Sequence, residues 1–513
     1  MQLTILASAI WDQCDGDARH DGLRSAARLF AGCDDRDRNP RRANDDPQGN
    51  LSAGDHQARE APFTGTFNTD GRWQVTPNVE VFADGSIGDT RLPDQAPPGV
   101  FQTETLAGTS LRAGVRADTA LGLLGLSGYR SDARVSLYDI GLANQGPLTF
   151  GEYQTTYVFE ASDLMKLGTG HSVRLGLEFR RNADDSDSLI LGKISNDIYA
   201  ASLMWDWQMT PSLALTNAVR VDHLLLHFAG TLLPTSGLTT AAYNATTLTE
   251  PSFNSGLVWK LTDEDTLRLS LARGVQLPTL LEYALQVPAG LYNPFVSYAG
   301  RPDLAPSIVW NAEVDYDRGR PAIGSVLRTA LFAQRIDDII SWPFGALLSF
   351  SAVHAPVFFS DNVGYSTAAG MELELKGHAD SGFRWNARYA LVSTTNHTPL
   401  GQGPVLTGTV DYAHSTPDHV LTGGIGYARD NWELDLRSRW QSSYLDFRLN
   451  PARTALNAVN IDNYITMNAR IGYRVTDSLT VALTAQQFNQ SQLVETAGPP
   501  VQRQIILSMS AHL

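Results

Sequence analysis

Apolar and polar residues alternate along most of this chain, in runs that keep apolar side chains on one face and charged side chains on the other. One run sets Leu373 and Leu375 against Glu372, Glu374 and Lys376. Alternation with a period of two is typical of a β-strand. Similar runs recur at residues 173–180, 308–317, 383–391 and 432–440. The pattern predicts an all-β protein built from two-faced strands.

The predicted strands are longer than those of an ordinary soluble sheet. Strands in globular proteins average about five or six residues, whereas these runs extend over about ten, which is the length that a tilted strand needs to cross a bilayer core. Short turns alternate with long loops, as in barrels with tight periplasmic ends and long outer ends. We therefore expect an antiparallel transmembrane β-barrel, with a soluble sandwich, whose half-buried strands also alternate, as the alternative.

An aromatic residue, an apolar residue, a Thr and a turn former recur together at the ends of four alternating runs. The copies are Trp73-Gln74-Val75-Thr76-Pro77, Trp207-Gln208-Met209-Thr210-Pro211, Trp259-Lys260-Leu261-Thr262-Asp263 and Tyr473-Arg474-Val475-Thr476-Asp477. An amphipathic ring is most stable at the boundary between lipid and water, and transmembrane barrels carry aromatic girdles there. We expect each of the four rings at such a boundary.

Clusters of turn-forming residues allow the strands to be counted. Short turns are predicted near residues 73–78, 116–119, 162–170, 207–212, 260–265, 317–324, 377–382, 429–431 and 474–478. These nine turns join eighteen strands, and residues 502–513 add a nineteenth. An odd number is unusual in a bacterial barrel formed by one chain. The alternating stretch Gln2–Trp11 would bring the number to twenty, so we expect 19–20 strands.

The final strand resembles the membrane-insertion signal of bacterial outer-membrane barrels. Its apolar positions alternate with polar ones and are Ile505, Leu507, Met509, Ala511 and Leu513. The usual last residue of that signal is Phe, so Leu513 is a mild departure. We expect this strand to direct insertion into the membrane.

Composition excludes several classes of protein. A mean hydropathy of -0.17, without an apolar run of about eighteen residues, excludes a helical membrane protein. The net charge of -15 leaves no basic face for nucleic acid. Cys14 and Cys33 have no metal-ligating neighbours at a useful spacing. Because the chain also lacks metalloprotease, phosphate-loop and nucleophile-elbow motifs, we expect no enzyme activity, catalytic residue, metal or cofactor.

Six short motifs, in their order and spacing, resemble TonB-dependent outer-membrane receptors. They are Arg273-Gly274 with Pro278, Leu280 and Glu282; Gly300-Arg301-Pro302-Asp303-Leu304-Ala305-Pro306; Asn311-Ala312-Glu313; Ile336 with Asp338 and Ile340; Asn362-Val363-Gly364; and Gly370-Met371-Glu372-Leu373-Glu374. Each motif alone is weak, but the series is specific. The resemblance covers roughly residues 63–513.

The resemblance implies a barrel of about 22 strands that surrounds an N-terminal plug. It further implies a monomer in the lipid of a Gram-negative cell outer membrane, where the TonB complex supplies energy to import an iron-siderophore, cobalamin, haem or a sugar. Charged residues such as Arg174, Glu372, Arg388 and Arg437 would line the path. Aromatic residues of the outer loops would either bind the ligand or pack together to hold the loops closed. The candidate ligand-binding residues are Tyr283, Tyr292, Phe295, Tyr298 and Phe344.

The first sixty residues do not fit the family pattern. No signal peptide, TonB-contacting box or plug is visible there, and residues 15–60 are too polar to bury enough surface to fold. We expect an irregular segment over 1–60, with a strand at 2–11, and a barrel over 61–513. The sequence thus suggests a receptor truncated or frame-shifted at its N-terminus and without a clear export signal. A passive porin-like channel, and an enzyme or soluble β-sheet binding protein, stay as alternatives.

Overall fold

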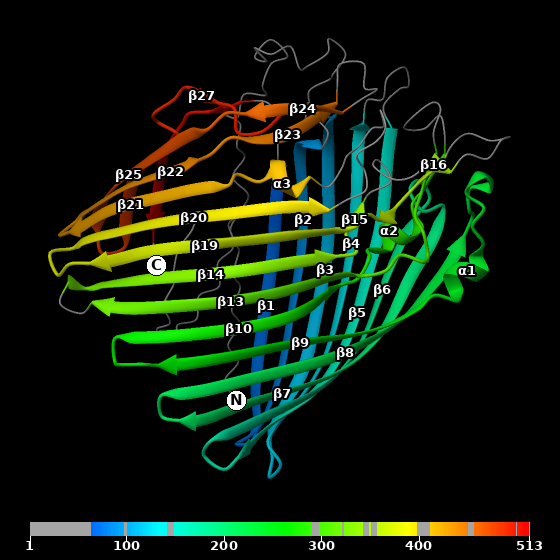
Figure 1. The fold of residues 1–513 in the computed structure, drawn as a ribbon, viewed down its shortest axis with the longest axis horizontal. Helices are drawn as coiled ribbons and strands as arrows, with labels where there is room; N and C mark the ends of the chain where they lie inside the picture. Colours follow the sequence, from blue (N-terminus) through cyan, green and yellow to red (C-terminus); the bar gives the residue numbers. More distant parts are fainter. Residues whose placement is uncertain are drawn as a thin grey trace.

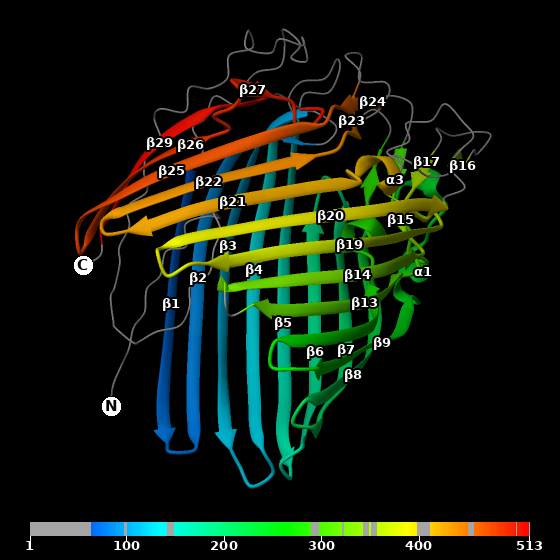
Figure 2. The same cartoon turned by 60° about the vertical axis from the view of Figure 1, so that its left-hand side comes forward.

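The computed structural model describes residues 63–96, 100–140, 148–288, 297–320, 323–341, 348–349, 357–397, 411–449, 456–498 and 500–511. A single antiparallel sheet of 19 strands contains most of these residues. The sheet curves around a central space, and the long loops gather at one of its ends (Figures 1 and 2). The predicted all-β class and the antiparallel barrel architecture are confirmed.

Ten strands of the sheet follow one another directly: β1 (Phe63–Thr76), β2 (Val79–Ala96), β3 (Val100–Asp118), β4 (Leu123–Ile140), β5 (Leu148–Leu167), β6 (His171–Ser186), β7 (Gly192–Thr210), β8 (Leu213–Gly230), β9 (Thr247–Lys260) and β10 (Asp265–Gln276). Nine more complete it: β13 (Ser307–Arg320), β14 (Ser325–Asp337), β19 (Tyr365–His378), β20 (Phe383–His397), β21 (His419–Arg429), β22 (Trp432–Gln441), β25 (Tyr464–Thr476), β26 (Leu479–Gln486) and β29 (Gln504–Ala511).

Short elements lie in the long loops. The helices are α1 (Thr240–Asn244), α2 (Leu280–Ala284), α3 (Tyr412–Ser415) and a 3-10 turn (Pro234–Ser236). The strands are β11 (Gln286–Val287), β12 (Ser297–Ala299), β15 (Ile340–Ser341), β16 (Leu348–Ser349), β17 (Val357–Phe359), β18 (Asp361–Asn362), β23 (Tyr444–Leu449), β24 (Leu456–Ile461), β27 (Gln492–Leu493) and β28 (Val501–Gln502). Among the described residues, none of the helices has the length and apolar character that a membrane span requires.

The repeated aromatic and Thr motifs form turns at one end of the sheet, because β1, β7, β9 and β25 all run in the same direction. In three copies the strand register shifts across the apolar residue, which is a β-bulge: Gln74/Thr76, Gln208/Thr210 and Arg474/Thr476. The Thr hydroxyl of each copy accepts a hydrogen bond from a backbone N–H two residues later. The bulge bends the strand and the hydroxyl closes the turn, which explains why this residue order recurs.

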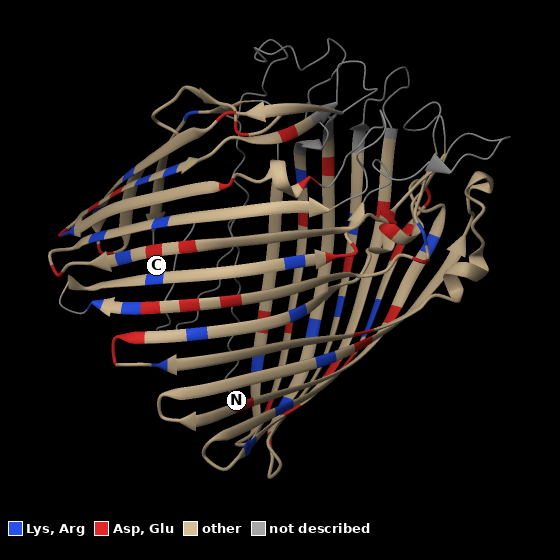
Figure 3. Cartoon of the chain, in the orientation of Figure 1, with Lys and Arg blue, Asp and Glu red and all other residues tan. Residues whose placement is uncertain are grey.

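Strand pairing separates an outer face from an inner face. Leu373 pairs with Tyr389 and Tyr389 with Leu421 on the outer face, whereas Glu374 pairs with Arg388 on the inner face. Leu373 is 36% exposed and Leu434 is 41% exposed, so neither packs into a protein core. Figure 3 shows charged positions spread along the strands, between uncharged ones. The predicted two-faced wall is confirmed.

Several strands are longer than the ten residues expected from the alternation, since β3 has 19 residues and β5 has 20. The outer face of β4 changes from apolar to charged toward the long loops. On β4, Leu126 is followed by Arg130 and Asp132, and the Arg130 guanidinium donates to the Asp132 carboxylate over 2.7 Å. Charges on a lipid-facing surface are costly near the bilayer midplane. The loop end of β4 therefore stands above the lipid.

The sheet has two edge strands among the described residues. The strand registers pair β1 with β2 and β29 with β26, and β1 and β29 stand at the two edges of the sheet in Figure 2. With 19 strands, β1 and β29 run in the same direction, so they could not pair antiparallel as barrel neighbours do. The proposed twentieth strand at 2–11, the segment 1–60 and Leu513 lie outside the described residues.

The largest buried core lies at the loop end of the sheet. Its side chains include Ile194 and Leu224 from the inner face of the wall, together with Tyr243, Tyr283 and Leu304 from the loops. A four-stranded sheet of β11, β12, β17 and β16 joins the β10–β13 loop to the β14–β19 loop through a parallel pairing of β12 with β17. We call α1, α2, β11, β12, β16 and β17 the cap. The cap packs against the inner face of β7 and β8.

Candidate ligand-binding cavity

A cavity of about 820 Å³ lies between the inner face of β5–β8 and the first residues of the cap. The wall contributes its polar lining, which consists of Glu152, Gln154, Thr156, Glu178, Arg180, Asn182, Asp184, Asn196, Arg220 and Asp222. The opposite side is largely apolar and consists of Val275, Leu277, Pro278, Thr279, Leu280 and Leu281. A cavity of this size with a few polar groups on an apolar background is typical of a small-molecule site.

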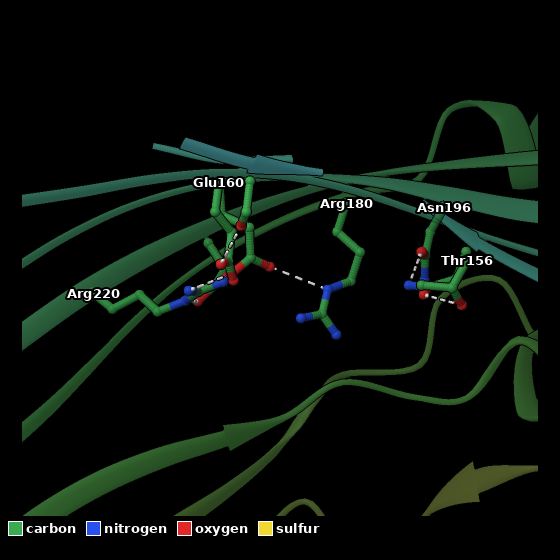
Figure 4. A network of polar contacts seen from close by, with 9 residues as sticks. Thr156, Glu160, Arg180, Asn196 and Arg220 are labelled. Atoms are coloured by element: carbon green, nitrogen blue, oxygen red, sulfur yellow. Dashed lines mark hydrogen bonds and ion pairs between the residues drawn. The ribbon is translucent and has the colours of Figure 1, made fainter. Parts of the chain in front are cut away.

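Two arginines form ion pairs along the wall of the cavity. Arg180 and Arg220 project from β6 and β8 in Figure 4, and each donates to Glu178 over 3.1 Å. Arg220 also contacts Asp222 at 2.7 Å. Glu178 therefore bridges two guanidinium groups, and this shared carboxylate orders both arginines across three neighbouring strands.

Amide side chains continue this polar surface toward the loops. The Thr156 hydroxyl donates to the Asn182 carbonyl oxygen over 3.2 Å, and the Asn182 amide donates to Asn196 over 2.9 Å. Figure 4 shows Thr156 and Asn196 on the same side of the wall as the arginines. The row offers both donors and acceptors to a molecule in the cavity.

The end of the cavity nearest the loops is acidic. Asp184 is only 3% exposed, and its Oδ1 atom has no hydrogen-bond partner among the described residues. Glu152 lies on the same face, and the Gln154 amide donates to its Oε2 atom over 3.1 Å. Neither carboxylate forms an ion pair with a described cation, in contrast to Glu178 and Asp222.

Helix α2 begins with a reciprocal capping box that positions the apolar side of the cavity. The Thr279 backbone N–H donates to the Glu282 carboxylate over 2.7 Å, and the Glu282 N–H donates to the Thr279 hydroxyl over 3.1 Å. This arrangement satisfies two backbone donors at the start of the helix. The family motif with Pro278, Leu280 and Glu282 thus fixes the start of α2, next to the cavity.

Arg301 links the two loops that form the cap. Its guanidinium contacts Asp303 at 2.6 Å and Asp361 at 3.2 Å. Asn362 adds three bonds, because its amide donates to the carbonyls of Ala305 and Asp338 while its oxygen accepts from the Ala305 N–H. The motifs Gly300–Pro306 and Asn362–Gly364 therefore hold the two loops together rather than face the cavity.

Replacing Arg301 by Gln should raise the pKa of the Asp303 carboxyl toward its ordinary value of 3.8, because the Arg301 hydrogen bond now holds that pKa lower. Because this pKa is lower in the folded cap than in the unfolded chain, the ionised Asp303 carboxylate stabilises the cap at pH values above the ordinary pKa. This stabilisation is lost as the pH falls through the lowered pKa. A carbon-13 NMR titration of the aspartate carboxyls measures the change. An unchanged Asp303 titration in the variant would contradict this role for Arg301.

The predicted ligand-binding aromatics fall into two groups. Tyr283 and Tyr298 are buried, at 0% and 2% exposure, and burial raises the pKa of the Tyr283 hydroxyl. Tyr298 stacks on Phe358, with 5.9 Å between the ring centroids. Both rings therefore pack inside the cap in this conformation, and ligand binding by them stays a prediction. The other candidates, Tyr292, Phe295 and Phe344, lie outside the described residues.

The other predicted residues are found as follows. Arg174, Glu372, Arg388 and Arg437 belong to the inner face, and Arg388 donates to Glu374 over 2.9 Å. Ile505, Leu507, Met509 and Ala511 lie on the outer face of β29.

Within the described residues, no cluster of three His, Cys, Asp or Glu side chains could hold a metal ion. The cavity residues were not predicted from the sequence, because their side chains come from four strands and become neighbours only through the strand register.

Comparisons with known proteins agree on one architecture. Residues 32–486 match the family model for the TonB dependent receptor-like β-barrel. The chain is similar to the FrpB iron transporter from Neisseria meningitidis (F5-1 variant), with a TM-score of 0.66 and 12% identity over 88% of this chain and 73% of that one. No sequence among the curated proteins matches.

Two further solved structures show the same likeness. A ferric enterobactin receptor (PfeA) mutant from Pseudomonas aeruginosa has a TM-score of 0.64 and 16% identity, over 89% of this chain and 71% of that one. The siderophore receptor PirA from Acinetobacter baumannii has a TM-score of 0.64 and 14% identity, over 87% and 70%. At these identities the likeness establishes a shared fold.

Proposed function

Because the chain belongs to the TonB-dependent receptor-like β-barrel family, a family of outer-membrane receptors and transporters, we propose that it takes up an iron-siderophore through its barrel. The structurally similar proteins are an iron transporter, a ferric enterobactin receptor and a siderophore receptor. One observation carries the proposal for this chain. A polar cavity lies on the inner face of the wall, beneath a folded cap at the loop end.

In uptake, the wall would bind the ligand and the cap would cover it. Ligand would enter from the loop end and exchange water for the hydrogen-bonding groups of β5–β8. The cap would cover it, since its two loops are joined through β12 and β17 and through Arg301. Release toward the periplasm would require energy from the TonB complex, as in the family. The charged inner face of the wall would provide a hydrated route for the ligand through the barrel.

Uptake of radioactive iron tests this function. The full chain is expressed in a Gram-negative strain that lacks its own siderophore receptors, and cells receive a panel of iron-loaded siderophores. We expect at least one siderophore to deliver iron several-fold above the empty-vector strain, and only when TonB is present. Equal delivery with and without TonB would identify a passive channel. Absence of both uptake and binding, with protein confirmed at the cell surface, would reject the proposal.

A further inference from the structure

The cavity is lined by more carboxyl groups than cationic groups. Four carboxylates line it, from Glu152, Glu178, Asp184 and Asp222, against the two guanidinium groups of Arg180 and Arg220. Both guanidinium groups are already bound, to Glu178 and, in the case of Arg220, also to Asp222. Neither guanidinium group of the lining is therefore free to bind an anionic ligand. The carboxyl groups of Glu152 and Asp184 have no ion-pair partner in the described part of the chain.

The two remaining carboxylates are adjacent on the inner face. Asp184 pairs across the strands with Gln154, and Glu152 is two residues further along the same strand. Asp184 is 3% exposed and its Oδ1 atom has no partner among the described residues. Burial and the nearby charge of Glu152 raise the pKa of the Asp184 carboxyl to about 7, and a cation or a hydrogen-bond donor beside it would favour its charged form. The unsatisfied oxygen thus indicates what a ligand would have to supply.

The opposite side of the same cavity is suited to a hydrocarbon chain. Leu277, Leu280 and Leu281 line it, and their position is held by the capping box of α2. An apolar surface that faces a pair of carboxylates matches a flexible alkyl chain with an ammonium group at its end, because the methylenes contact leucine while the ammonium reaches the acids. A guanidinium group would satisfy the same charge, but alkyl amines fit the apolar side better.

Building on the proposed function, we propose that the cavity recognises a ferric siderophore by a protonated amine on an alkyl arm, which binds between Glu152 and Asp184. The substrate class is therefore a ferric chelate that carries a free alkyl amine. A trianionic catecholate chelate is disfavoured, since it would meet two unpaired carboxylates and no available cation. This inference narrows the ligand by charge and shape, and it concerns a site separate from the cap aromatics.

A pair of ligands tests the inference without altering the protein. Ferrioxamine B carries one free ammonium group, and its N-acetyl derivative differs only in the loss of that charge. Equilibrium binding to the full chain in detergent is measured for both compounds and for ferric enterobactin. We expect ferrioxamine B to bind roughly tenfold to a hundredfold more tightly than its N-acetyl form, as for a hydrogen bond that involves charged groups. Ferric enterobactin should bind more weakly than either.

Variants then locate the recognition. Asp184→Asn and Glu152→Gln should each reduce the preference for the free amine, and the double variant should abolish it. Glu160→Gln is the matched control, because Glu160 is an inner-face carboxylate outside the cavity lining that accepts a hydrogen bond from Ser127. It should leave the preference unchanged. Heat-modifiable electrophoretic mobility confirms that each variant is folded.

The outcomes separate this inference from the proposed function. Equal binding of ferrioxamine B and its N-acetyl form, or tightest binding of ferric enterobactin, would overturn the inference while leaving siderophore uptake in place. A preference for the free amine that survives in the double variant would also overturn it. Failure of every siderophore to bind folded protein would instead reject the proposed function.

Discussion

Replacing Gly300 by Ala should detach the cap while the wall stays folded. Gly300 is buried against α2, where its backbone N–H donates to the Leu285 carbonyl over 2.8 Å. A Cβ atom at this position would lie 2.5 Å from the carbonyl oxygen of Glu282 and closer still to the Tyr283 carbonyl. Backbone atoms cannot move aside as a flexible side chain does. The clash therefore has to be relieved by shifting α2 or by moving the β12 strand away from it.

Hydrogen exchange of residues 280–288 measures this detachment. Overpacking of a buried site costs roughly 1–3 kcal/mol, which corresponds to a loss of protection of about fivefold to 150-fold if the cap opens as a unit. The protection of β5–β8 should be unchanged. Gly256→Ala is the matched control, since an added Cβ there meets only the Leu269 carbonyl at 4.0 Å. Equal protection of α2 in both variants would show that Gly300 is not needed for cap closure.

The same substitution links the cap to binding. If the cap covers the ligand, the Gly300→Ala protein should bind any siderophore more weakly, mainly through faster dissociation, because an open cap no longer encloses it. A variant with a loosened cap and unchanged dissociation would mean that the wall alone holds the ligand. The pair of measurements thus separates the contribution of the cap from that of β5–β8.

Strands and turns were predictable because their signals are local. Alternation between Glu372 and Lys376 needs only neighbouring residues, and Thr76 closes its turn with an N–H two residues later. The short turns found in the structure accordingly follow the predicted ones. Strand length was underestimated because the outer-face charges that extend β4 beyond the lipid, such as Arg130, break the apolar alternation without ending the strand.

The cap and the cavity could not be predicted, because they depend on contacts between distant residues. β12 and β17 pair over only three residues each and lie about sixty positions apart in the sequence. Nothing in the sequence near Tyr283 shows that its ring would meet Leu224 and Leu304 in one core. In the same way, Glu152 and Asp184 become neighbours only through the register of β5 with β6. The family motifs nevertheless marked the residues that hold the cap together, such as Gly300 and Arg301.

Leu507→Arg should prevent stable insertion of the barrel. Leu507 lies on the outer face of β29, pairs with Leu483 and is 74% exposed, as a side chain in contact with lipid would be. An arginine on the lipid face near the bilayer midplane costs roughly 2–4 kcal/mol. The cost falls on the last strand, which is an edge of the sheet among the described residues and has fewer neighbours to retain it.

Ser508→Arg provides the matched comparison, because it adds the same side chain one residue away on the inner face. Ser508 pairs with Ala482, and its hydroxyl donates to the Ala482 carbonyl only over a long 3.4 Å contact. The measurement is the amount of protein that stays in urea-washed outer membranes and shows heat-modifiable mobility. We expect a severalfold loss for Leu507→Arg and little change for Ser508→Arg. Equal loss in both would show that the effect does not depend on which face carries the charge, and would contradict the assignment of Leu507 to a lipid-facing surface.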